Sequence, residues 1–318
     1  MRKVLKIEKP ALDGAAWTKV TVCGNVIEVL SMEKYPQGCC CKKLDADHYM
    51  NLFSGEVLEY SHADTKADCA DSVRKTMKRI RNTINANVTD PACCKFVTLT
   101  YAENMTDTAR LYKDYEKFWK KILRYCSRKG IPAPKYITVI EPQGRGAWHA
   151  HCIWIWEQPA PFVPNDDIAA MWGHGFTKTK GVQTCDNIGA YFSAYLADMP
   201  LSEFEQLPEQ EQADAYKYIS SIEEKTISED GVTIQKKFVK GARLFMYPPG
   251  MNILRTSRGL KQPDVEVTTL RQAEKKVSAA TETFSSAFAI EIDGEKQNTI
   301  IKTYYNTKRQ KSQEKKEG

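Results

Sequence analysis

The run from Trp148 to Trp156, WHAHCIWIW, constrains the fold of this chain more than any other segment. A short apolar run of this kind, rich in β-branched and aromatic residues, predicts a β-strand. Side chains alternate between the two faces of a strand, so His149 and His151 point the same way, about 7 Å apart. Two imidazoles on one strand face can bind one metal ion, although ordinary surface or core histidines show the same pattern.

The composition describes a folded protein. Of 318 residues, 42% are hydrophobic and 10% aromatic, which is enough for a core and excludes a disordered chain. The length is long for one domain and short for three. The sequence contains no apolar run of about 18 residues and no apolar segment of a secretion signal near Met1. We therefore expect a cytoplasmic protein with no membrane partner.

The net charge is +6, and the basic residues are unevenly distributed. They cluster at 74–81, at 117–129 and in the tail at 302–318, whereas 203–211 is acidic. Basic clusters suit contact with nucleic-acid phosphates, and they equally suit solvated helix surfaces.

The ten cysteines include adjacent runs, such as Cys93-Cys94, that suit neither a disulfide framework nor a paired zinc motif. In a reducing cytosol we expect free thiols. A zinc knuckle formed by Cys39, Cys41 and His48 is an alternative, but its spacing matches no standard ligand pattern.

Periodicity predicts a mixture of helices and hairpin-connected strands, which indicates an α+β fold with a central antiparallel sheet flanked by helices. Near the N-terminus we expect a hairpin over 18–32 and a loop over 37–43. The expected elements further along are a helix from Asp71, a strand at 95–101, a helix from Thr108 that ends at Gly130, a strand at 135–141, the histidine strand, helices at 166–171 and 186–197, a helix at 268–280, and a last hairpin with arms at 287–292 and 299–301.

These elements predict four regions. Residues 1–70 hold the N-terminal hairpin and the cysteine-rich loop, and residues 71–265 hold the α+β domain. Residues 266–305 form a C-terminal helix and hairpin, and 306–318 form a basic disordered tail. The acidic stretch at 203–216 is expected to be a helical insertion.

Glu141 ends the strand that precedes the histidine strand. The turn between them allows the two strands to pair antiparallel, so this carboxylate can lie beside His149 and His151. One oxygen and two nitrogen ligands with open positions suit Mg²⁺, Mn²⁺ or Zn²⁺. On spacing alone, Glu141 is equally compatible with an exposed strand end.

Tyr191 and Tyr195 are four residues apart on a predicted helix, so they lie on one helix face. Their hydroxyls can approach a common point. The same spacing is common in ordinary amphipathic helices, where the tyrosines are part of the core.

In this order, the motifs resemble those of the HUH endonucleases, most closely the two-tyrosine rolling-circle replication initiators of bacterial plasmids and phages. Residues 96–100 resemble the first motif of the family, His149-Ala150-His151 the second, and the tyrosine helix the third. Residues 240–244 and 257–259 also resemble segments of such initiators. The resemblance covers about residues 70 to 260 and implies a ferredoxin- or RRM-like sheet.

The resemblance implies a mechanism. A tyrosine, with Tyr195 favoured over Tyr191 as the initiating one, attacks a phosphodiester of single-stranded origin DNA. Glu141, His149 and His151 hold a divalent metal, Mg²⁺ or Mn²⁺ with Zn²⁺ as an option, that polarises the phosphate. The products are a 5′-phosphotyrosine and a 3′-hydroxyl primer, and a second transfer reseals the strand.

The chain departs from the family where lysines usually follow each tyrosine by three residues, because Ala194 and Asp198 stand there. Activation then depends on the metal and another cation, or the enzyme is slow or degenerate. The chain has no Walker-type phosphate loop, which implies a host helicase beside the DNA polymerase. The candidates for origin DNA contacts are Arg243, Arg255, Arg258 and Lys261, with surface solvation as the alternative.

Two other functions remain open. A two-tyrosine transposase or a conjugative relaxase would use the same chemistry, but relaxases often carry more histidines in the metal motif and larger C-terminal domains. A non-catalytic DNA-binding protein with a structural metal would explain the absent lysines.

Overall fold

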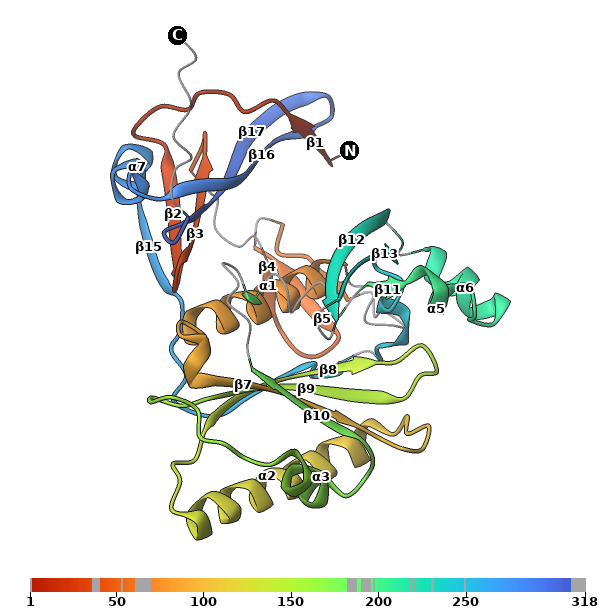
Figure 1. The fold of residues 1–318 in the computed structure, drawn as a ribbon. Coiled ribbons are helices and arrows are strands. Elements are labelled where there is room, and N and C mark those ends of the chain that lie inside the picture. Colours follow the sequence, from red (N-terminus) through yellow and green to blue (C-terminus); the bar gives the residue numbers. More distant parts are fainter. Residues whose placement is uncertain are drawn as a thin grey trace. The chain divides into compact units, whose positions relative to one another are not determined.

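The computed structural model divides the chain into two compact units (Figure 1). The central unit spans residues 63–261, and the terminal unit combines 1–62 with 262–318. The structure describes residues 2–35, 41–52, 54–60, 70–181, 188–189, 196, 198–217, 219, 221–229, 232–248 and 250–309. Cys39 of the alternative zinc knuckle and most of the expected tail, from residue 310 on, lie outside the described residues.

The terminal unit is built on a six-stranded antiparallel sheet to which both ends of the chain contribute. The helix α7 (Leu270–Val277) packs on one face, where Ala273 and Val277 contact Val20 and Val29. The strands follow in the order β1 (Arg2–Ile7), β16 (Thr281–Ile292), β17 (Glu295–Asn306), β3 (Val26–Met32), β2 (Trp17–Cys23) and β15 (Asp264–Thr269). A separate small sheet contains β4 (Cys41–Lys43), β5 (His48–Asn51) and β6 (Val57–Glu59).

Local signals in the terminal unit were predictive, whereas its long-range pairing was not. The hairpin over 18–32 is confirmed as β2 and β3, joined at Gly24 in the left-handed region (φ 58°). The helix at 268–280 is confirmed as α7, which Thr269 caps. The prediction of a loop up to Lys43 was wrong at its end, because β4 pairs there with β5. The strand β1 was not predicted, since its partner β16 lies almost 300 residues away.

The central unit contains a five-stranded antiparallel sheet flanked by helices, which confirms the α+β prediction (Figure 1). The histidine strand occupies its centre. The order is β10 (Thr177–Gly181), β7 (Cys94–Thr100), β9 (Trp148–Ile155), β8 (Lys135–Pro142) and β14 (Leu254–Thr256). β14 was not predicted, because three residues are too few to show a periodicity.

Helices cover both faces of this sheet (Figure 1). α1 (Ala70–Asn87) lies on one face, and α2 (Thr108–Lys129) and α3 (Asn165–Trp172) lie on the other. α2 begins where Asp107 accepts hydrogen bonds from the amides of residues 109 and 110, and it ends at Gly130 in the left-handed region (φ 65°). The sheet is therefore apolar on both sides, and a polar site needs a gap in this cover.

A three-stranded sheet follows the histidine strand in the central unit. The order is β11 (Met199–Pro200), β13 (Val232–Val239) and β12 (Ile222–Glu229). The helical insertion expected at 203–216 is present as two short helices, α5 (Leu201–Phe204) and α6 (Glu209–Tyr216). The hairpin of β12 and β13 was not predicted, because its charged sequence lacks an apolar alternation. No helix in the described part of the chain is long and apolar enough to cross a membrane.

The packing of α2 gives a testable prediction. Leu111 is fully buried against the sheet, whereas Leu123 on the same helix is 40% exposed. Leu111→Ala should lower the free energy of unfolding by about 2–5 kcal/mol, because it removes buried methyl groups and leaves a cavity. Leu123→Ala should change it by less than about 1 kcal/mol. Urea unfolding followed by tryptophan fluorescence measures both, and equal losses would contradict the packing of α2.

Candidate active site

The strand register brings the three predicted ligands to one face of the central sheet. Glu141 of β8 lies directly opposite His149 of β9, and Val139 lies opposite His151. Residues directly opposite one another in an antiparallel pair share a face, so Glu141, His149 and His151 are neighbours. α2 lies on the other face, where the hydroxyl groups of Tyr115 and Thr138 form a hydrogen bond.

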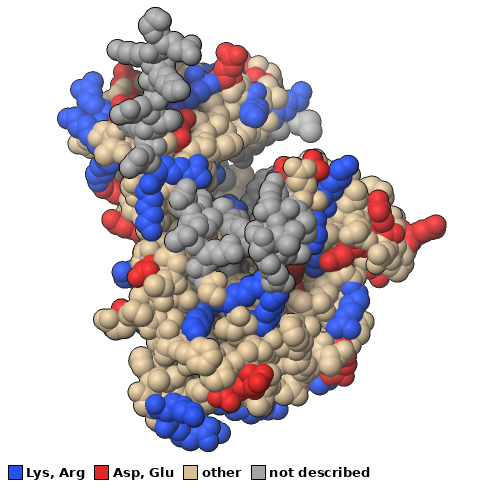
Figure 2. All heavy atoms as spheres, in the orientation of Figure 1, with Lys and Arg blue, Asp and Glu red and all other residues tan. Residues whose placement is uncertain are grey.

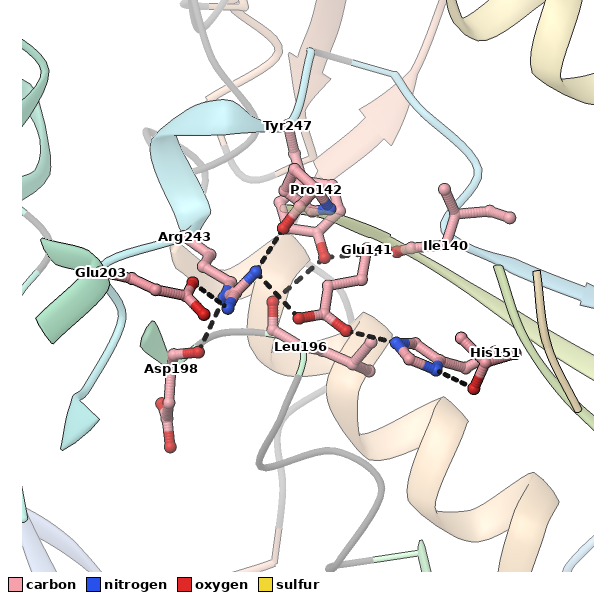
Figure 3. A network of polar contacts seen from close by, with 10 residues as sticks. Ile140, Glu141, Pro142, His151, Leu196, Asp198, Glu203, Arg243 and Tyr247 are labelled. Carbon is pink, nitrogen blue, oxygen red and sulfur yellow. Dashed lines mark hydrogen bonds and ion pairs between the residues drawn. The ribbon is translucent and has the colours of Figure 1, made fainter. Parts of the chain in front are cut away.

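Glu141 and His151 are in direct contact (Figure 3). The Nε2 atom of His151 lies 2.6 Å from Oε2 of Glu141, and its Nδ1 atom lies 3.5 Å from the hydroxyl oxygen of Thr98 on β7. Phe96 stacks on the His151 ring, with 5.7 Å between centroids and 14° between planes. The His151 ring is therefore held by contacts at both nitrogens and on one face.

His149 has a different environment. Its Nε2 atom is buried and has no hydrogen-bond partner among the described residues. Its ring lies 5.9 Å from that of His151, at an angle of 82°. Burial, followed by the nearby positive charge of His151, lowers the pKa of His149 to about 4 against the opposing effect of Glu141. At neutral pH His149 is neutral, and one of its ring nitrogens has a free electron pair.

Arg243 holds Glu141 from the side away from the histidines (Figure 3). Its Nη1 atom lies 3.0 Å from Oε1 of Glu141 and also donates to the carbonyl oxygen of Pro142. Its Nη2 atom donates to Glu203 at 2.9 Å, and its Nε atom donates to the carbonyl oxygen of Asp198 at 2.9 Å. One oxygen of Glu141 therefore contacts Arg243, and the other contacts His151.

Burial raises the pKa of Glu141, but the hydrogen bond from His151 and the charges of His151 and Arg243 outweigh burial. The pKa of Glu141 ends below its usual value, so this buried side chain is a carboxylate at neutral pH. A buried carboxylate needs such partners, because an unpaired one is strongly unfavourable.

The described residues contain no three His, Cys, Asp or Glu side chains arranged around a common point as in a finished metal site. The reason is the hydrogen bond between Glu141 and His151, in which the two predicted ligands contact each other. The residues nevertheless fit a divalent cation. They offer one oxygen and two nitrogens, and the buried Nε2 of His149 lacks the partner that a ligand would provide. Binding would replace the hydrogen bond between Glu141 and His151.

The segment that follows the predicted tyrosines is fixed to the end of β8 (Figure 3). The Tyr247 hydroxyl lies 3.0 Å from the carbonyl oxygen of Leu196 and 3.2 Å from that of Ile140, and its one proton is donated to these two acceptors. The side chain of Asp198 accepts a hydrogen bond from the amide of Gly241 at 3.4 Å. Asp198, which stands where the resemblance leads one to expect a lysine, is therefore a buried structural residue.

The segment that precedes the tyrosines is fixed to α1. The amide of Gly189 donates to the side chain of Asn85 at 2.9 Å. A Cβ atom at Gly189 would lie 2.5 Å from the carbonyl oxygen of Arg81, so only glycine fits at this distance. Residues 188, 189 and 196 are helical, in agreement with the helix predicted here. Tyr191 and Tyr195 lie outside the described residues, so their predicted catalytic role stays a prediction.

The four candidate DNA contacts lie in different environments. Arg243 is buried in the network around Glu141, so DNA would reach it only if this network opened. Arg255 pairs with Thr138 and stacks over the ring of Tyr112 at 4.8 Å, which places it on the α2 face, away from the histidines. Arg258 is exposed just after β14, and Lys261 is exposed with its backbone bonded to Asn87.

Sequence reasoning missed the supporting residues Glu203, Tyr247 and Asn85. Each is a polar residue whose partner lies at least 40 residues away along the chain. No local spacing records such a contact. The one signal in the sequence was the segment around Arg243, which was selected for its charge and was assigned to the surface.

One comparison with known proteins gives a match. Residues 94–200 match a family model described as a replication-associated protein of the ORF2 type. This range begins at β7, contains Glu141, both histidines and both tyrosines, and spans roughly a third of the chain. Arg243 lies beyond it. No curated protein and no solved structure matches the chain.

The network around Glu141 predicts unequal effects of two substitutions. Arg243→Gln should lower the free energy of unfolding by about 3–5 kcal/mol, because it leaves a buried carboxylate without its cationic partner. Glu203→Gln should cost less than about 1 kcal/mol, since Glu203 is half-exposed and lies on the outer side of Arg243. Chemical denaturation compares them, and a small effect of Arg243→Gln would show that the buried pair is not formed.

Proposed function

We propose that this protein initiates rolling-circle replication by nicking single-stranded origin DNA with a tyrosine. The observation that carries the proposal is the meeting of Glu141, His149 and His151 on one sheet face, with the Nε2 atom of His149 unpartnered among the described residues. The match to the replication-associated family supports it, because the matched range contains these residues and both tyrosines.

Glu141, His149 and His151 would hold the divalent cation, Mg²⁺ or Mn²⁺, with Zn²⁺ also compatible with this ligand set. Such a cation, when bound, supplies the positive charge that polarises a scissile phosphate. The surrounding residues orient the ligands. Arg243 fixes one oxygen of Glu141, and Phe96 fixes the plane of the His151 ring.

The proposed reaction exchanges one phosphoester for another. The hydroxyl oxygen of Tyr195 bonds to the scissile phosphorus and loses its proton, the bond from phosphorus to the 3′ oxygen breaks, and the 3′ oxygen takes up a proton. The products are a 5′-phosphotyrosine and a 3′-hydroxyl that primes synthesis. Tyr191 would attack the site regenerated after one round, and the freed 3′-hydroxyl would reverse the first step to close the strand.

The proposed partners follow from this chemistry. The substrate is single-stranded origin DNA, and the 3′-hydroxyl primer requires a host DNA polymerase. The sequence has no phosphate loop of the Walker type, so strand separation is assigned to a host helicase. These partners are cytoplasmic in a bacterium, and we place the protein there.

A second candidate is a non-catalytic DNA-binding protein with a structural metal. Asp198 favours it, because this buried residue stands where the resemblance leads one to expect a lysine. A transposase or relaxase would share the chemistry and differ in its DNA. An origin hairpin beside the gene supports the initiator, and transposon ends would support the transposase.

A covalent adduct tests the tyrosine chemistry. Single-stranded oligonucleotides that span the origin, incubated with the protein and Mg²⁺ or Mn²⁺, should yield a protein–DNA adduct on a denaturing gel. Tyr191→Phe combined with Tyr195→Phe should abolish it. The control is Tyr216→Phe, which changes an exposed tyrosine of α6 and should leave the adduct intact. An adduct that persists in the double variant would show that the nucleophile is another residue.

Metal binding tests the ligand set without cleavage. His149→Ala should weaken Mn²⁺ binding at least about 10- to 100-fold in calorimetry, because removing a direct ligand should cost no less than removing a supporting residue. The control is His174→Ala, since His174 contacts Asp114 of α2 and is not a proposed ligand. Unchanged Mn²⁺ affinity in His149→Ala would exclude the proposed site.

A further inference from the structure

The edge strand β10 carries two lysines in the same rows as the candidate site. In its pairing with β7, Lys178 lies opposite Thr98 and Lys180 lies opposite Phe96. Thr98 in turn lies opposite His151 on β9. Lys178, Thr98 and His151 therefore form one row across three neighbouring strands, and residues in such a row point to the same face.

The other side of β10 fixes the direction of these lysines. Asn165 of α3 donates to the carbonyl oxygen of Thr177 at 3.1 Å and accepts hydrogen bonds from the hydroxyls of Thr177 and Thr179, at 3.3 Å and 3.1 Å. Both threonines are thus held on the α3 side of the sheet. Because side chains alternate along a strand, Lys178 and Lys180 are directed to the histidine face.

This edge combines charge with an aromatic surface. Lys180 is exposed, Lys178 is half-buried, and Phe96 is half-buried beside His151. Figure 2 shows Lys and Arg atoms gathered near the middle of the central unit, next to the residues drawn in grey. Interleaved basic and aromatic side chains along a groove are typical of surfaces that bind single-stranded nucleic acid.

Neighbouring strands are about 4.8 Å apart, so Lys178 starts roughly 10 Å from His151 along the row. A lysine side chain covers much of this distance. A single strand with one phosphate at His151 can therefore place a neighbouring phosphate over Thr98 and within reach of Lys178. A direct role at the scissile phosphate is not needed for this contact.

We propose that Lys178 and Lys180 bind phosphates of single-stranded DNA beside the scissile phosphate. They would supply positive charge that the tyrosine helix lacks at Ala194 and Asp198. The position of the scissile phosphate rests on the proposed function, but the binding of DNA by β10 does not require cleavage.

The test measures binding of a labelled single-stranded origin oligonucleotide by anisotropy, in EDTA and over a range of KCl concentrations. For the double variant Lys178→Gln and Lys180→Gln, the slope of log affinity against log salt should become shallower by about 1.4, because each phosphate contact on a single strand contributes about 0.7. The variant with arginine at both positions should keep the slope, since it keeps both charges.

Lys95→Gln is the matched control. Lys95 lies on β7 opposite Trp154, on the other face of the sheet, and its Nζ atom lies 5.4 Å from the centre of the Phe162 ring. Its removal changes the net charge by the same step and should leave the slope unchanged. An equal loss in Lys95→Gln, or an unchanged slope in the glutamine double variant, would overturn the inference.

The two proposals fail separately. If the wild-type protein forms no covalent adduct but the glutamine double variant loses salt dependence, the nicking function fails and the phosphate contacts stand. If the adduct forms and the slope is unchanged, nicking stands and the role of β10 is wrong. Mn²⁺ affinity should be unchanged in the double variant, and a loss of Mn²⁺ affinity would show that the lysines act through the metal site, contrary to the inference.

Discussion

The buried carboxylate of Glu141 is the interaction on which the site depends. One of its oxygens contacts His151 of β9, and the other contacts Arg243, which follows β13. Arg243 also binds the backbone at Asp198, close to the end of the segment that contains the tyrosines. A single ion pair therefore joins the histidine strand, the downstream segment and the end of the tyrosine segment. An unpaired carboxylate at this depth would be strongly unfavourable, which explains why so many donors converge here.

The central sheet separates support from chemistry. Its α2 face is closed by aromatic packing, including Phe118 against Trp154 and Trp172. Its other face carries Glu141 and both histidines, and in the absence of a ligand the site is closed by the hydrogen bond between Glu141 and His151. Only the Nε2 atom of His149 is then left without a partner among these described side chains. A ligand at this point would satisfy that atom without a change in the backbone register.

The parts of the site that the sequence predicted are those fixed by local rules. The strands β8 and β9 are joined by a short turn, so the order of residues 141–151 determines which side chains face one another. Arg243 was placed at the surface because its charge was visible and its buried partners, 40 and about 100 residues away, were not. The sheet shared by the two ends of the chain was missed for the same reason. Long-range pairing depends on contacts that a local pattern does not record.

The central claim is that Glu141, His149 and His151 bind one divalent cation. Crystals soaked in Mn²⁺ and measured for anomalous scattering test it most directly. The account predicts one strong peak within bonding distance of a Glu141 oxygen and of a ring nitrogen from each histidine, with the hydrogen bond between Glu141 and His151 replaced. A fully occupied Mn²⁺ site elsewhere, with that hydrogen bond intact, would contradict the account.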